Sequence, residues 1–448
     1  MPTPVKWEML RRWLIGYPKD KADFLISGFK QGFKLGYEGP RCYQTSPNLK
    51  SALDKPDIVF DKITSELQAG RISGPHQSKP FENFKVSPLG IVPKKNPGEY
   101  RLIHHLSFPR NSGRSVNENI PDTFATVSYA GIQEAISQNK QLGRGCYMSK
   151  TDIRSAFRIC PIYPGDQELL GFEWEGQLYY DRCLPFGARS SCQIFERLSS
   201  ALEWIALHKL GCQAVVYILD DFLFINKTEA GCSRDLKAFL TMCGTIGIPI
   251  AEEKTCAPNT SMTFVGISLC SVRMEASLPT DKLQKCRALL HEFCSKKSCK
   301  LRDLQSLLGY LNFCCSVITC GRAFLRRLID LTIGISKPFF HVRFNKDTRS
   351  DIQLWLSFLD QYNGRSMFLN DSFLTSQTLR LYTDSAKSLG YGAVYGTQWL
   401  YGEFPSLGNS LALPFWSFTL SFWQSTFGAH YGKTIVFYSL LTMRHLLQ

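Results

Sequence analysis

The chain has 448 residues and a mass of 50.8 kDa, which leaves room for several domains and excludes a single small binding module. Hydrophobic residues make up 44% of it and charged residues 20%, a composition that excludes overall disorder. Its 52 lysines and arginines exceed its 38 aspartates and glutamates, so the net charge is +14. That surplus suits nucleic acid, although contact with a membrane or a ribosome and a merely solvated basic surface remain open.

The spacing of the cysteines and the sequence of the amino terminus indicate in which cellular compartment the protein is expected. The 16 cysteines form no CxxC pair and have no histidines at zinc-site spacing, so neither a zinc site nor disulfides are expected. The amino terminus lacks a basic start followed by a long apolar run, which indicates an intracellular, reducing compartment and leaves cytoplasm and nucleus open. Residues 404–432 contain no Asp, Glu, Lys or Arg, but prolines and polar residues interrupt them, so no membrane span is expected.

The first predicted elements are helical and are followed by a hairpin. Residues 49–70 carry apolar side chains at mostly helical spacing and end at Gly70, which predicts a helical lead-in with a glycine C-cap. In residues 86–106, the β-type runs LGIVP and YRLIHHL flank the basic turn KKNPG. This composition predicts a hairpin whose basic tip can meet phosphates.

Strands and helices then mix. Residues 146–271 contain the strand-like CYMSKTDI, the helix-like CQIFERLSSALEWIALHKL and the β run AVVYILDDFLFI, which together predict an α+β core. Residues 282–331 place leucines on one helical face and predict a basic helical bundle. After a looser stretch at 337–375, the runs TLRLYTDSA, LGYGAVYG and QWLYGEF predict a three-stranded meander that opens a last domain.

Acidic residues in this core point to metal chemistry. Asp220 and Asp221 interrupt an apolar strand with no basic neighbour, and two adjacent buried carboxylates are costly unless a divalent cation supplies the missing charge. An exposed hairpin turn is the alternative, because aspartate is a common turn residue. Asp152 ends the strand-like run KTDI. If one sheet brings Asp152 beside Asp220, the pair can hold two Mg²⁺ ions for nucleotidyl transfer.

An ordered series of motifs resembles those of retroelement reverse transcriptases. The series runs SPLGIVPKKNPGEYRLIHHLSFP, SVNENI, KTDIRSAF, LPFGARSSCQIFERL, YILDDFLFI, GIPIAEEKT and FVGISL. The residues of these motifs are similar to those of the DIRS-type retrotransposon group, notably in GRISGP, LDDFLF and LQSLLGYLNF. The resemblance covers about residues 20 to 400, and the order of so many motifs makes it far more specific than a lone pattern.

The resemblance assigns roles to the acidic core. It implies that Asp152 and Asp220 are the principal ligands of Mg²⁺ or Mn²⁺, with Asp221 as the second acid of the pair and Ile153 contributing its backbone carbonyl. It places Phe157 under the incoming sugar, where a bulky ring excludes a 2′-hydroxyl and selects deoxynucleotides. An ordinary core phenylalanine is the alternative for this ring.

The nucleotide-binding residues follow in the same way. Lys94, Lys95 and Arg101 match the fingers positions that bind the triphosphate, and a solvated basic hairpin is the alternative. Gly187 lets the backbone approach nucleotide or template closely. Phe186 stands where many retroviral relatives have Gln, so the polar contacts of that side chain are not expected.

Two further positions qualify this pattern. Lys254 in EEKT is the implied general acid that protonates pyrophosphate, with an exposed helix-end lysine as the alternative. Ile218, two residues before Asp220, stands where the family commonly has an aromatic residue. Tyr217 is offset by one residue, and on a strand this offset turns its ring to the opposite face.

The last segment resembles the opening of a ribonuclease H domain. In TLRLYTDSAKSLGYGAVYG, Asp384 would be the first metal ligand. Such a site needs further carboxylates, yet no Asp or Glu follows Glu403, and Trp416 and Leu440 stand nearest to the expected acids. We therefore expect a truncated, inactive hydrolase module.

The resemblance implies a right-hand polymerase of the α+β class followed by an incomplete ribonuclease-H-like α/β domain. Its predicted parts are a helical lead-in (1–83), fingers and palm (84–271), a helical thumb (272–336), a connection (337–376) and the truncated ribonuclease-H-like domain (377–448). The implied activity is RNA-directed DNA polymerisation, with an RNA template, a DNA primer, their RNA–DNA hybrid and dNTPs as partners and no membrane.

Other functions remain open at this stage. The chain could be a non-catalytic nucleic-acid-binding remnant of a decayed element, which the eroded end favours and the intact acids disfavour. It could be a ribonuclease acting on RNA–DNA hybrids if the last domain is active. An RNA-templated RNA polymerase is disfavoured by Phe157 and by the segment around Asp384.

Overall fold

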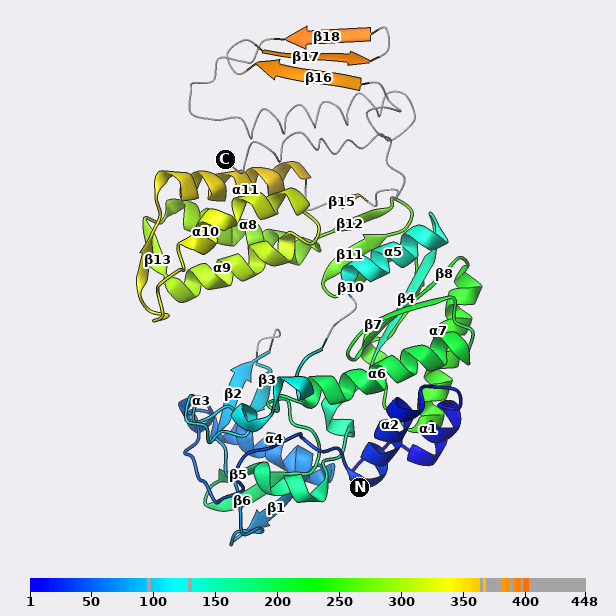
Figure 1. Ribbon diagram of the computed structural model, residues 1–448, viewed down its shortest axis with the longest axis vertical. Helices are drawn as coiled ribbons and strands as arrows, with labels where there is room; N and C mark the ends of the chain where they lie inside the picture. The colour runs from blue at the N-terminus through cyan, green and yellow to red at the C-terminus, as the bar shows by residue number, and fades with distance from the viewer. Residues whose placement is uncertain are drawn as a thin grey trace. The chain divides into compact units, whose positions relative to one another are not determined.

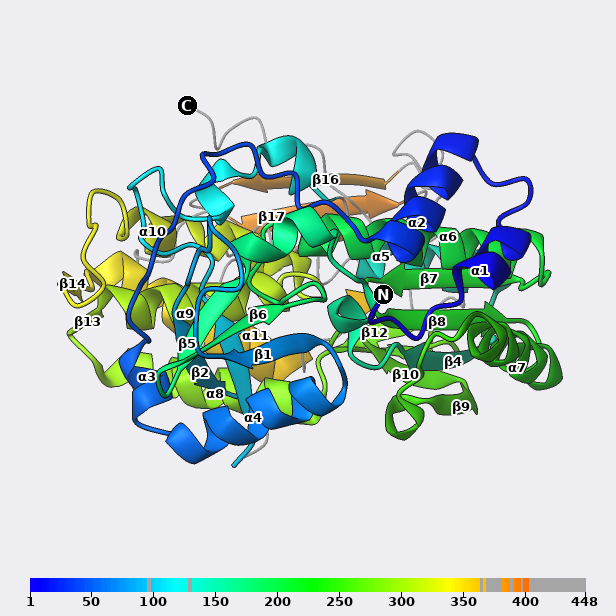
Figure 2. The same cartoon turned by 90° about the horizontal axis from the view of Figure 1, so that it is seen from below.

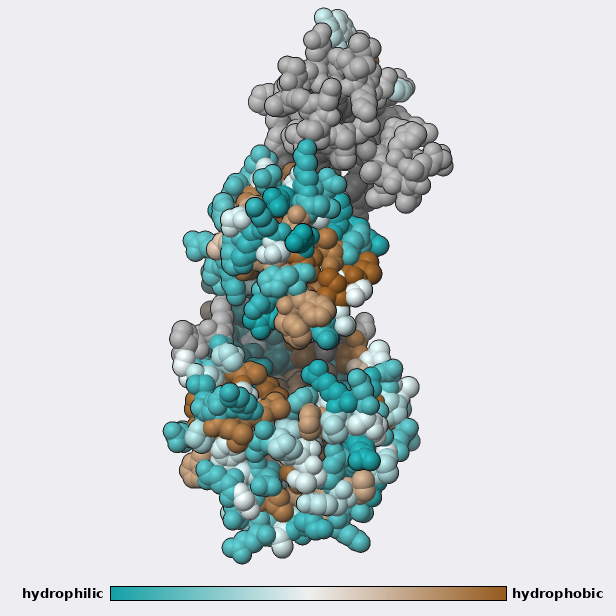
Figure 3. Space-filling view, turned by 90° about the vertical axis from the view of Figure 1, so that its left-hand side faces the viewer, coloured by the Kyte–Doolittle hydropathy of each residue, from teal (hydrophilic) through white to brown (hydrophobic). Residues whose placement is uncertain are grey.

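The structure is a computed structural model, and its contacts divide the chain into two units, Met1–Met367 and Phe368–Gln448. Polar residues cover most of the described surface on the face shown in Figure 3. Among the described residues, no helix is both long and apolar enough to cross a membrane. The described residues are 1–94, 98–127, 131–362, 366–367, 381–386, 390–395 and 398–402.

Four helices precede the first strand: α1 (Trp7–Trp13), α2 (Lys19–Gln31), α3 (Lys50–Leu53) and α4 (Pro56–Gln68). The last two confirm the predicted helical lead-in, and Gly70 follows α4 with a positive φ of 69°, as a glycine C-cap requires. The first two, coloured blue in Figure 1, pack against helices of the following core.

Two small antiparallel sheets follow: β1 (Ile72–His76), β2 (Leu89–Pro93), β3 (Tyr100–His104), β5 (Gly171–Trp174) and β6 (Gln177–Asp181). One has the order β1-β6-β5, and the other is the hairpin β2–β3. This hairpin confirms the prediction for residues 86–106, and its register places Val92 opposite Arg101. The basic tip of the hairpin includes residues 95–97, which lie outside the described part.

The central sheet has four antiparallel strands in the order β7-β8-β4-β9: β4 (Tyr147–Asp152), β7 (Ala214–Ile218), β8 (Asp221–Asn226) and β9 (Cys256–Asn259). Its helices are α5 (Ile132–Leu142), α6 (Ser191–His208) and α7 (Glu229–Ile246). Figure 2 shows β7, β8 and β4 side by side, with α6 over β7. Alternate residues such as Val215, Phe222 and Phe224 are buried in one core with side chains of α6 and α7, so the predicted α+β core is confirmed.

Short 3₁₀ turns connect these elements: η1 (Asn117–Asn119), η2 (Asp122–Phe124), η3 (Ala156–Ile159), η4 (Pro164–Leu169), η5 (Glu252–Lys254) and η6 (Thr319–Phe324). The turn η3 begins after Ser155, whose φ of 61° redirects the chain directly after β4. The KTDIRSAF motif therefore begins on the sheet and ends in the buried core, where Phe157 packs against Phe195 of α6.

The rest of the first unit is mainly helical: β10 (Ser261–Phe264), β11 (Ile267–Cys270), β12 (Glu275–Ser277), α8 (Thr280–Ser295), β13 (Ser298–Lys300), α9 (Leu301–Cys314), α10 (Arg326–Asp330), β14 (His341–Arg343), α11 (Lys346–Tyr362) and β15 (Ser366–Met367). The strands β10, β11, β12 and β15 form one antiparallel sheet, and β13 pairs with β14. The helices α8 and α9 confirm the helical bundle predicted for residues 282–331.

Helix α11 corrects the prediction of a looser stretch at 337–375. Ile352, Trp355 and Leu359 are fully buried, and their helical spacing makes α11 a further member of the bundle, packed on α8. Arg287 of α8 donates to the carbonyl of Leu359 at 2.6 Å. This packing extends the first unit to Met367, well into the predicted connection.

The described part of the second unit is a meander of three antiparallel strands, β16 (Leu381–Ala386), β17 (Gly390–Tyr395) and β18 (Gln398–Gly402) (Figure 1). It confirms the predicted meander, and its register places Asp384 opposite Gly392. Glu403, Trp416 and Leu440 lie outside the described residues.

Candidate active site

The predicted acids meet at one end of the central sheet. Asp152 is the last residue of β4 and is paired in register with Asp221, the first residue of β8. Directly opposed residues of an antiparallel pair place their side chains on the same face. The backbone N–H of Ile153 donates to the carbonyl of Asp220 at 2.9 Å, which ties the third acid to the same place.

A tight turn presents Asp220. Leu219 and Asp220 link β7 to β8, and Leu219 has a φ of 54°, a left-handed conformation that is costly for a branched side chain. The hairpin turn considered as an alternative for the Asp-Asp pair is therefore present. It differs from an ordinary exposed turn, because both acids are partly buried and face a third.

The acids disfavour one another's ionised forms. Burial and the charge of Asp152 raise the pKa of Asp220 above its ordinary value. Burial raises the pKa of Asp221 to about 6, with the charges of Asp152 and Asp220 adding to the rise and that of Lys150 opposing it. Burial and mutual repulsion thus both disfavour ionisation of Asp220 and Asp221.

Lys254 forms an ion pair with one of these acids. Its Nζ atom is 2.8 Å from Oδ2 of Asp152, although more than half of its side chain is exposed. Partial burial disfavours its charged form, but the hydrogen bond to Asp152 and the charges of Asp152, Asp220 and Asp221 outweigh burial and raise its pKa. The lysine is therefore held protonated beside the acids.

The donor chemistry of the site fits a hard divalent cation. Within the described ranges no group of three or more His, Cys, Asp or Glu side chains converges as a ready metal site. Asp152 and Asp220 nevertheless supply carboxylate oxygens, the donor type that Mg²⁺ or Mn²⁺ prefers. The carbonyl of Ile153 lies on the same side of its strand as its N–H, which faces Asp220, so it is a third oxygen directed towards the turn.

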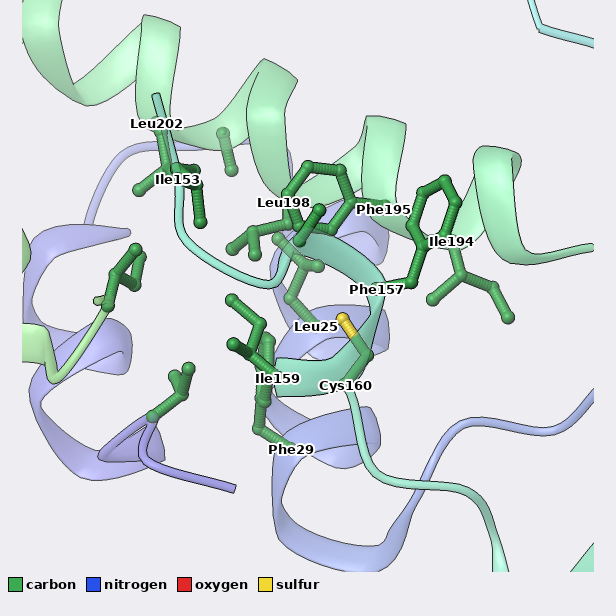
Figure 4. Packing of buried hydrophobic residues seen from close by; sticks show 14 of the residues in the cluster. Leu25, Phe29, Ile153, Phe157, Ile159, Cys160, Ile194, Phe195, Leu198 and Leu202 are labelled. Carbon is green, nitrogen blue, oxygen red and sulfur yellow. The ribbon is translucent and has the colours of Figure 1, made fainter. Parts of the chain in front are cut away.

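An aromatic cluster lies beside the acids. The ring of Phe157 on η3 is 5.3 Å from that of Phe186 and 5.6 Å from that of Phe195 on α6. Figure 4 shows Phe157 next to Phe195 and Ile194. Phe157 is buried, whereas Phe186 is half-exposed and lies 5.3 Å from the guanidinium carbon of Arg101 on β3. Three of the predicted nucleotide-binding residues, Phe157, Phe186 and Arg101, are thus in successive contact.

Comparisons with known proteins agree with this arrangement. Residues 92–269 match the family model described as reverse transcriptase (RNA-dependent DNA polymerase). The matched range includes the strands β4, β7 and β8 of the central sheet.

The chain is similar in sequence to retroviral and retrotransposon polyproteins. The chain is 23% identical over 313 residues to the Gag-Pro-Pol polyprotein of Mason-Pfizer monkey virus, which covers 67% of this chain and 16% of that protein. It is 26% identical over 217 residues to the retrovirus-related Pol polyprotein from transposon gypsy of Drosophila melanogaster, covering 47% of this chain and 19% of that protein. The chain thus spans less than a fifth of the length of either polyprotein.

Solved structures show the same fold. The foamy viral protease-reverse transcriptase dRH in complex with double-stranded DNA matches with a TM-score of 0.56 and 19% identity over 92% of this chain and 67% of that one. The foamy viral enzyme in complex with an RNA/DNA hybrid matches with a TM-score of 0.55 and 17% identity over 94% of this chain and 55% of that one. The polymerase fold predicted for the chain is therefore confirmed.

Gly187 lies against protein backbone. A Cβ atom at this position would be 1.9 Å from the carbonyl oxygen of His104. Asn117 donates from Nδ2 to the carbonyl of Gly187 at 2.8 Å and accepts at Oδ1 from the N–H of Arg189 at 2.9 Å. Asn117 was missed in the sequence, where the motif SVNENI was noted but no residue in it was given a role.

Two of the three residues predicted to bind the triphosphate, Lys94 and Arg101, are among the described residues. Nζ of Lys94 lies 3.4 Å from Oε2 of Glu99 across the hairpin, and both side chains are largely exposed. Lys95 lies outside the described residues. Of the three predicted cations, Arg101 is the one that the structure brings to the aromatic cluster.

The back of the β7–β8 hairpin is supported by acids of α6. Tyr217 is paired with Phe222 and so faces away from Asp221, as the strand alternation predicts, and its hydroxyl donates to Oε1 of Glu196 at 2.7 Å. Burial, together with the charges of Glu196 and Glu134, raises the pKa of Glu203, also on α6, to about 7. This helix therefore carries one carboxyl that the fold prefers to keep protonated.

We expect Glu203→Gln to stabilise the protein at pH 8 and to leave its stability unchanged at pH 4.5. The unfolded pKa is near 4.5 and the folded one about 7, so wild-type stability falls as pH rises between these values. Allowing for solvent screening, the glutamine should raise the unfolding free energy at pH 8 by about 1–2 kcal/mol. Urea unfolding at both pH values measures this, and an equal difference at both would contradict it.

Proposed function

We propose that this chain is the reverse transcriptase of a retroelement, an RNA-directed DNA polymerase that extends a DNA primer on an RNA or DNA template. The observation that carries the proposal is the group formed by Asp152, Asp220, Asp221 and Lys254 at the end of the central sheet, within a reverse-transcriptase domain. A non-catalytic remnant would have no reason to keep repelling, partly buried acids together.

Each part of the site has a role in this reaction. Asp152 and Asp220, with the carbonyl of Ile153, would hold Mg²⁺ or Mn²⁺, while Asp221 completes the pair. When bound, these ions would activate the primer 3′-hydroxyl and stabilise the charge of the leaving pyrophosphate. The ring of Phe157 would exclude a 2′-hydroxyl of the incoming sugar and so select deoxynucleotides.

The cations of the site fit the phosphates of dNTPs. Arg101 offers a planar fork for the triphosphate next to Phe186, and Lys94 and Lys95 add charge from the hairpin. Lys254 can pass its Nζ proton to the departing pyrophosphate oxygen.

A nucleic-acid duplex is the expected partner of the whole chain. Its net charge of +14 suits binding to the phosphates of an RNA–DNA hybrid. The foamy viral structures of the same fold contain double-stranded DNA or an RNA/DNA hybrid, which agrees with these partners.

We assign the element to the DIRS-type group and the last segment to a ribonuclease-H-like remnant. The motif wording supports the first assignment, and the meander β16–β18 containing Asp384 supports the second. Residues 404–448 contain no Asp or Glu, and Trp416 and Leu440 stand nearest to the expected acids, so this segment supplies no further carboxylate for hydrolysis.

Primer extension tests the polymerase. A DNA primer annealed to an RNA template should be extended with dNTPs and Mg²⁺, and rNTPs should substitute poorly. Absence of extension by the intact chain would refute the proposal. Cleavage of the RNA strand of a hybrid that Asp384→Asn abolishes would show that the last segment is an active ribonuclease.

We expect Lys254→Ala to reduce kcat about 10- to 100-fold while the KM for dNTPs changes little, since the proton acts in the transition state. Lys254→Arg should retain binding but transfer the proton less readily, because arginine holds it more tightly. Steady-state kinetics on one primer–template measure both variants. An alanine variant with wild-type kcat would assign Lys254 to the exposed structural role considered as the alternative.

A further inference from the structure

A buried arginine follows the proposed sugar-excluding residue. Arg158 is the neighbour of Phe157 on the 3₁₀ turn η3, where successive side chains point about a third of a turn apart. The ring of Phe157 faces α6, whereas the side chain of Arg158, only 8% exposed, is directed into the protein. A charged group there needs a complete set of partners.

Arg158 has that set, and it comes from separate segments. Its Nε and NH2 atoms lie 2.9 and 2.8 Å from Oε2 of Glu66 on α4, and NH2 lies 2.7 Å from Oδ1 of Asp181 on β6. Its NH1 atom donates to the carbonyls of Cys183 at 3.1 Å and Leu184 at 3.4 Å. Burial disfavours the guanidinium charge, but Asp181 and Glu66 outweigh burial and raise the pKa of Arg158.

The network continues to the strand that carries Arg101. Oδ2 of Asp181 lies 2.9 Å from Nδ1 of His104 on β3, and Nε2 of His104 lies 3.1 Å from the carbonyl of Gly171. The backbone carbonyl of His104 is in turn the group that contacts Gly187. Arg158 therefore connects η3 to β3, the strand beside the nucleotide pocket.

These contacts fix the loop that presents Phe186. Its first residue, Leu184, is bound by NH1 of Arg158, and its last, Gly187, is bound by Asn117 and packed on His104. Between these anchors, the ring of Phe186 lies 5.3 Å from that of Phe157. One side chain thus holds both the turn that carries Phe157 and the loop that carries Phe186.

Stability alone does not explain a buried ion pair at this place. Well-packed apolar residues stabilise a core as well as or better than buried charges, whereas a guanidinium with several partners defines the distances between the segments that it joins. The two aromatic rings that it aligns are those that the proposed polymerase function places beside the incoming sugar.

We propose that Arg158 is a positioning residue that sets the spacing of Phe157 and Phe186, and through it the discrimination between deoxy- and ribonucleotides. The inference rests on the proposed polymerase function. Arg158 does not touch the nucleotide; it acts through Phe157.

The test is the ratio of kcat/KM for a dNTP to that for the matching rNTP. This ratio cancels the active fraction of a preparation, so partial unfolding does not change it. Arg158→Lys keeps the charge but cannot reach all the partners at once, and we expect it to lower the ratio about tenfold. Phe157→Val should lower the ratio by removing the ring. The ratio of the double variant should differ from that of Phe157→Val alone by no more than about twofold.

Arg287→Lys is the matched control. It removes a guanidinium contact of the same kind, to the carbonyl of Leu359, in the bundle far along the chain from the pocket. We expect it to lower the melting temperature and leave the ratio unchanged. A ratio for Arg158→Lys equal to wild type, or effects of Arg158→Lys and Phe157→Val that simply multiply, would overturn the inference.

A milder variant covers the case in which Arg158→Lys fails to fold. Glu66→Gln weakens one partner at the edge of the network and leaves Asp181 in place. We expect a fall of about threefold in the ratio, and an unchanged ratio in the folded variant would also overturn the inference. If the wild-type chain incorporates neither nucleotide, the polymerase proposal itself fails. If it prefers dNTPs and the variants keep the wild-type ratio, only the role of Arg158 fails.

Discussion

Asp220→Asn should lower primer extension at least about a thousandfold, the largest effect on activity expected for a single change in this chain. The substitution keeps the shape of the side chain but removes its negative charge. Of the two acids that interact with Asp152, only Asp221 then remains. A divalent cation would then lose a charged oxygen ligand, and a neutral amide oxygen replaces it poorly. Asp152→Asn should have a similar effect on kcat.

The stability of this variant should move in the opposite direction. Because burial and Asp152 raise the pKa of Asp220, its ionised form costs folding free energy at neutral pH, and asparagine removes that cost. We therefore expect Asp220→Asn to melt at the same temperature as wild type or higher. Single-turnover extension and thermal unfolding on the same preparation measure the two effects.

A matched control separates the site from net charge. Asp61→Asn makes the same chemical change at an exposed residue of α4 and should leave extension unchanged. If Asp220→Asn extends primers at a rate within tenfold of wild type, Asp220 is not one of the metal-binding pair. A variant that is inactive and melts much lower would leave its inactivity explained by unfolding.

The sequence was most informative where chemistry and local pattern coincide. Asp152 ends a strand-like run and Asp220 interrupts another. The register of β4 with β8 places Asp152 opposite Asp221, and the bond from the N–H of Ile153 to the carbonyl of Asp220 brings Asp220 to the same place. The hairpin around residues 86–106 and the meander β16–β18 were predictable for the same reason, because alternation and turn residues are local signals.

Features that depend on distant partners were not predictable from local patterns. Nothing around Arg158 indicates that its partners are Glu66 and Asp181, since these residues meet only in the folded chain. The role of Asn117 is similarly non-local, as it bonds the backbone of Gly187 70 residues away. Helix α11 was missed because its buried stripe is short of leucines and its polar residues dominate the window.

Gly187 shows how a correct residue can have a reason other than the predicted one. The resemblance implied that its missing side chain lets the backbone approach nucleotide or template. In the structure the close neighbour is the carbonyl of His104, so the need for glycine is already present without any ligand. Both roles can hold together, because the loop must lie close to β3 in order to present Phe186.

Gly187→Ala should be among the most destabilising single substitutions in this chain. The added Cβ would lie 1.9 Å from the backbone oxygen of His104, and no rotamer change can relieve a clash with backbone. Neither side can move freely, because Asn117 bonds the carbonyl of Gly187 and Asp181 holds the ring of His104. We expect a loss of about 2–4 kcal/mol in unfolding free energy.

The same substitution at Gly244 should have the opposite sign. Gly244 lies on the exposed face of α7, its added Cβ would meet nothing within 4 Å, and alanine favours a helix interior by about 1 kcal/mol over glycine. Urea unfolding of both variants therefore compares one chemical change in two environments. If Gly187→Ala unfolds at the wild-type urea midpoint, the loop can move away from β3, and the spacing of Phe186 from Phe157 is not fixed from that side. If it is destabilised while Gly244→Ala is stabilised, the anchor at His104 is rigid, and the loop that carries Phe186 is held at both of its ends.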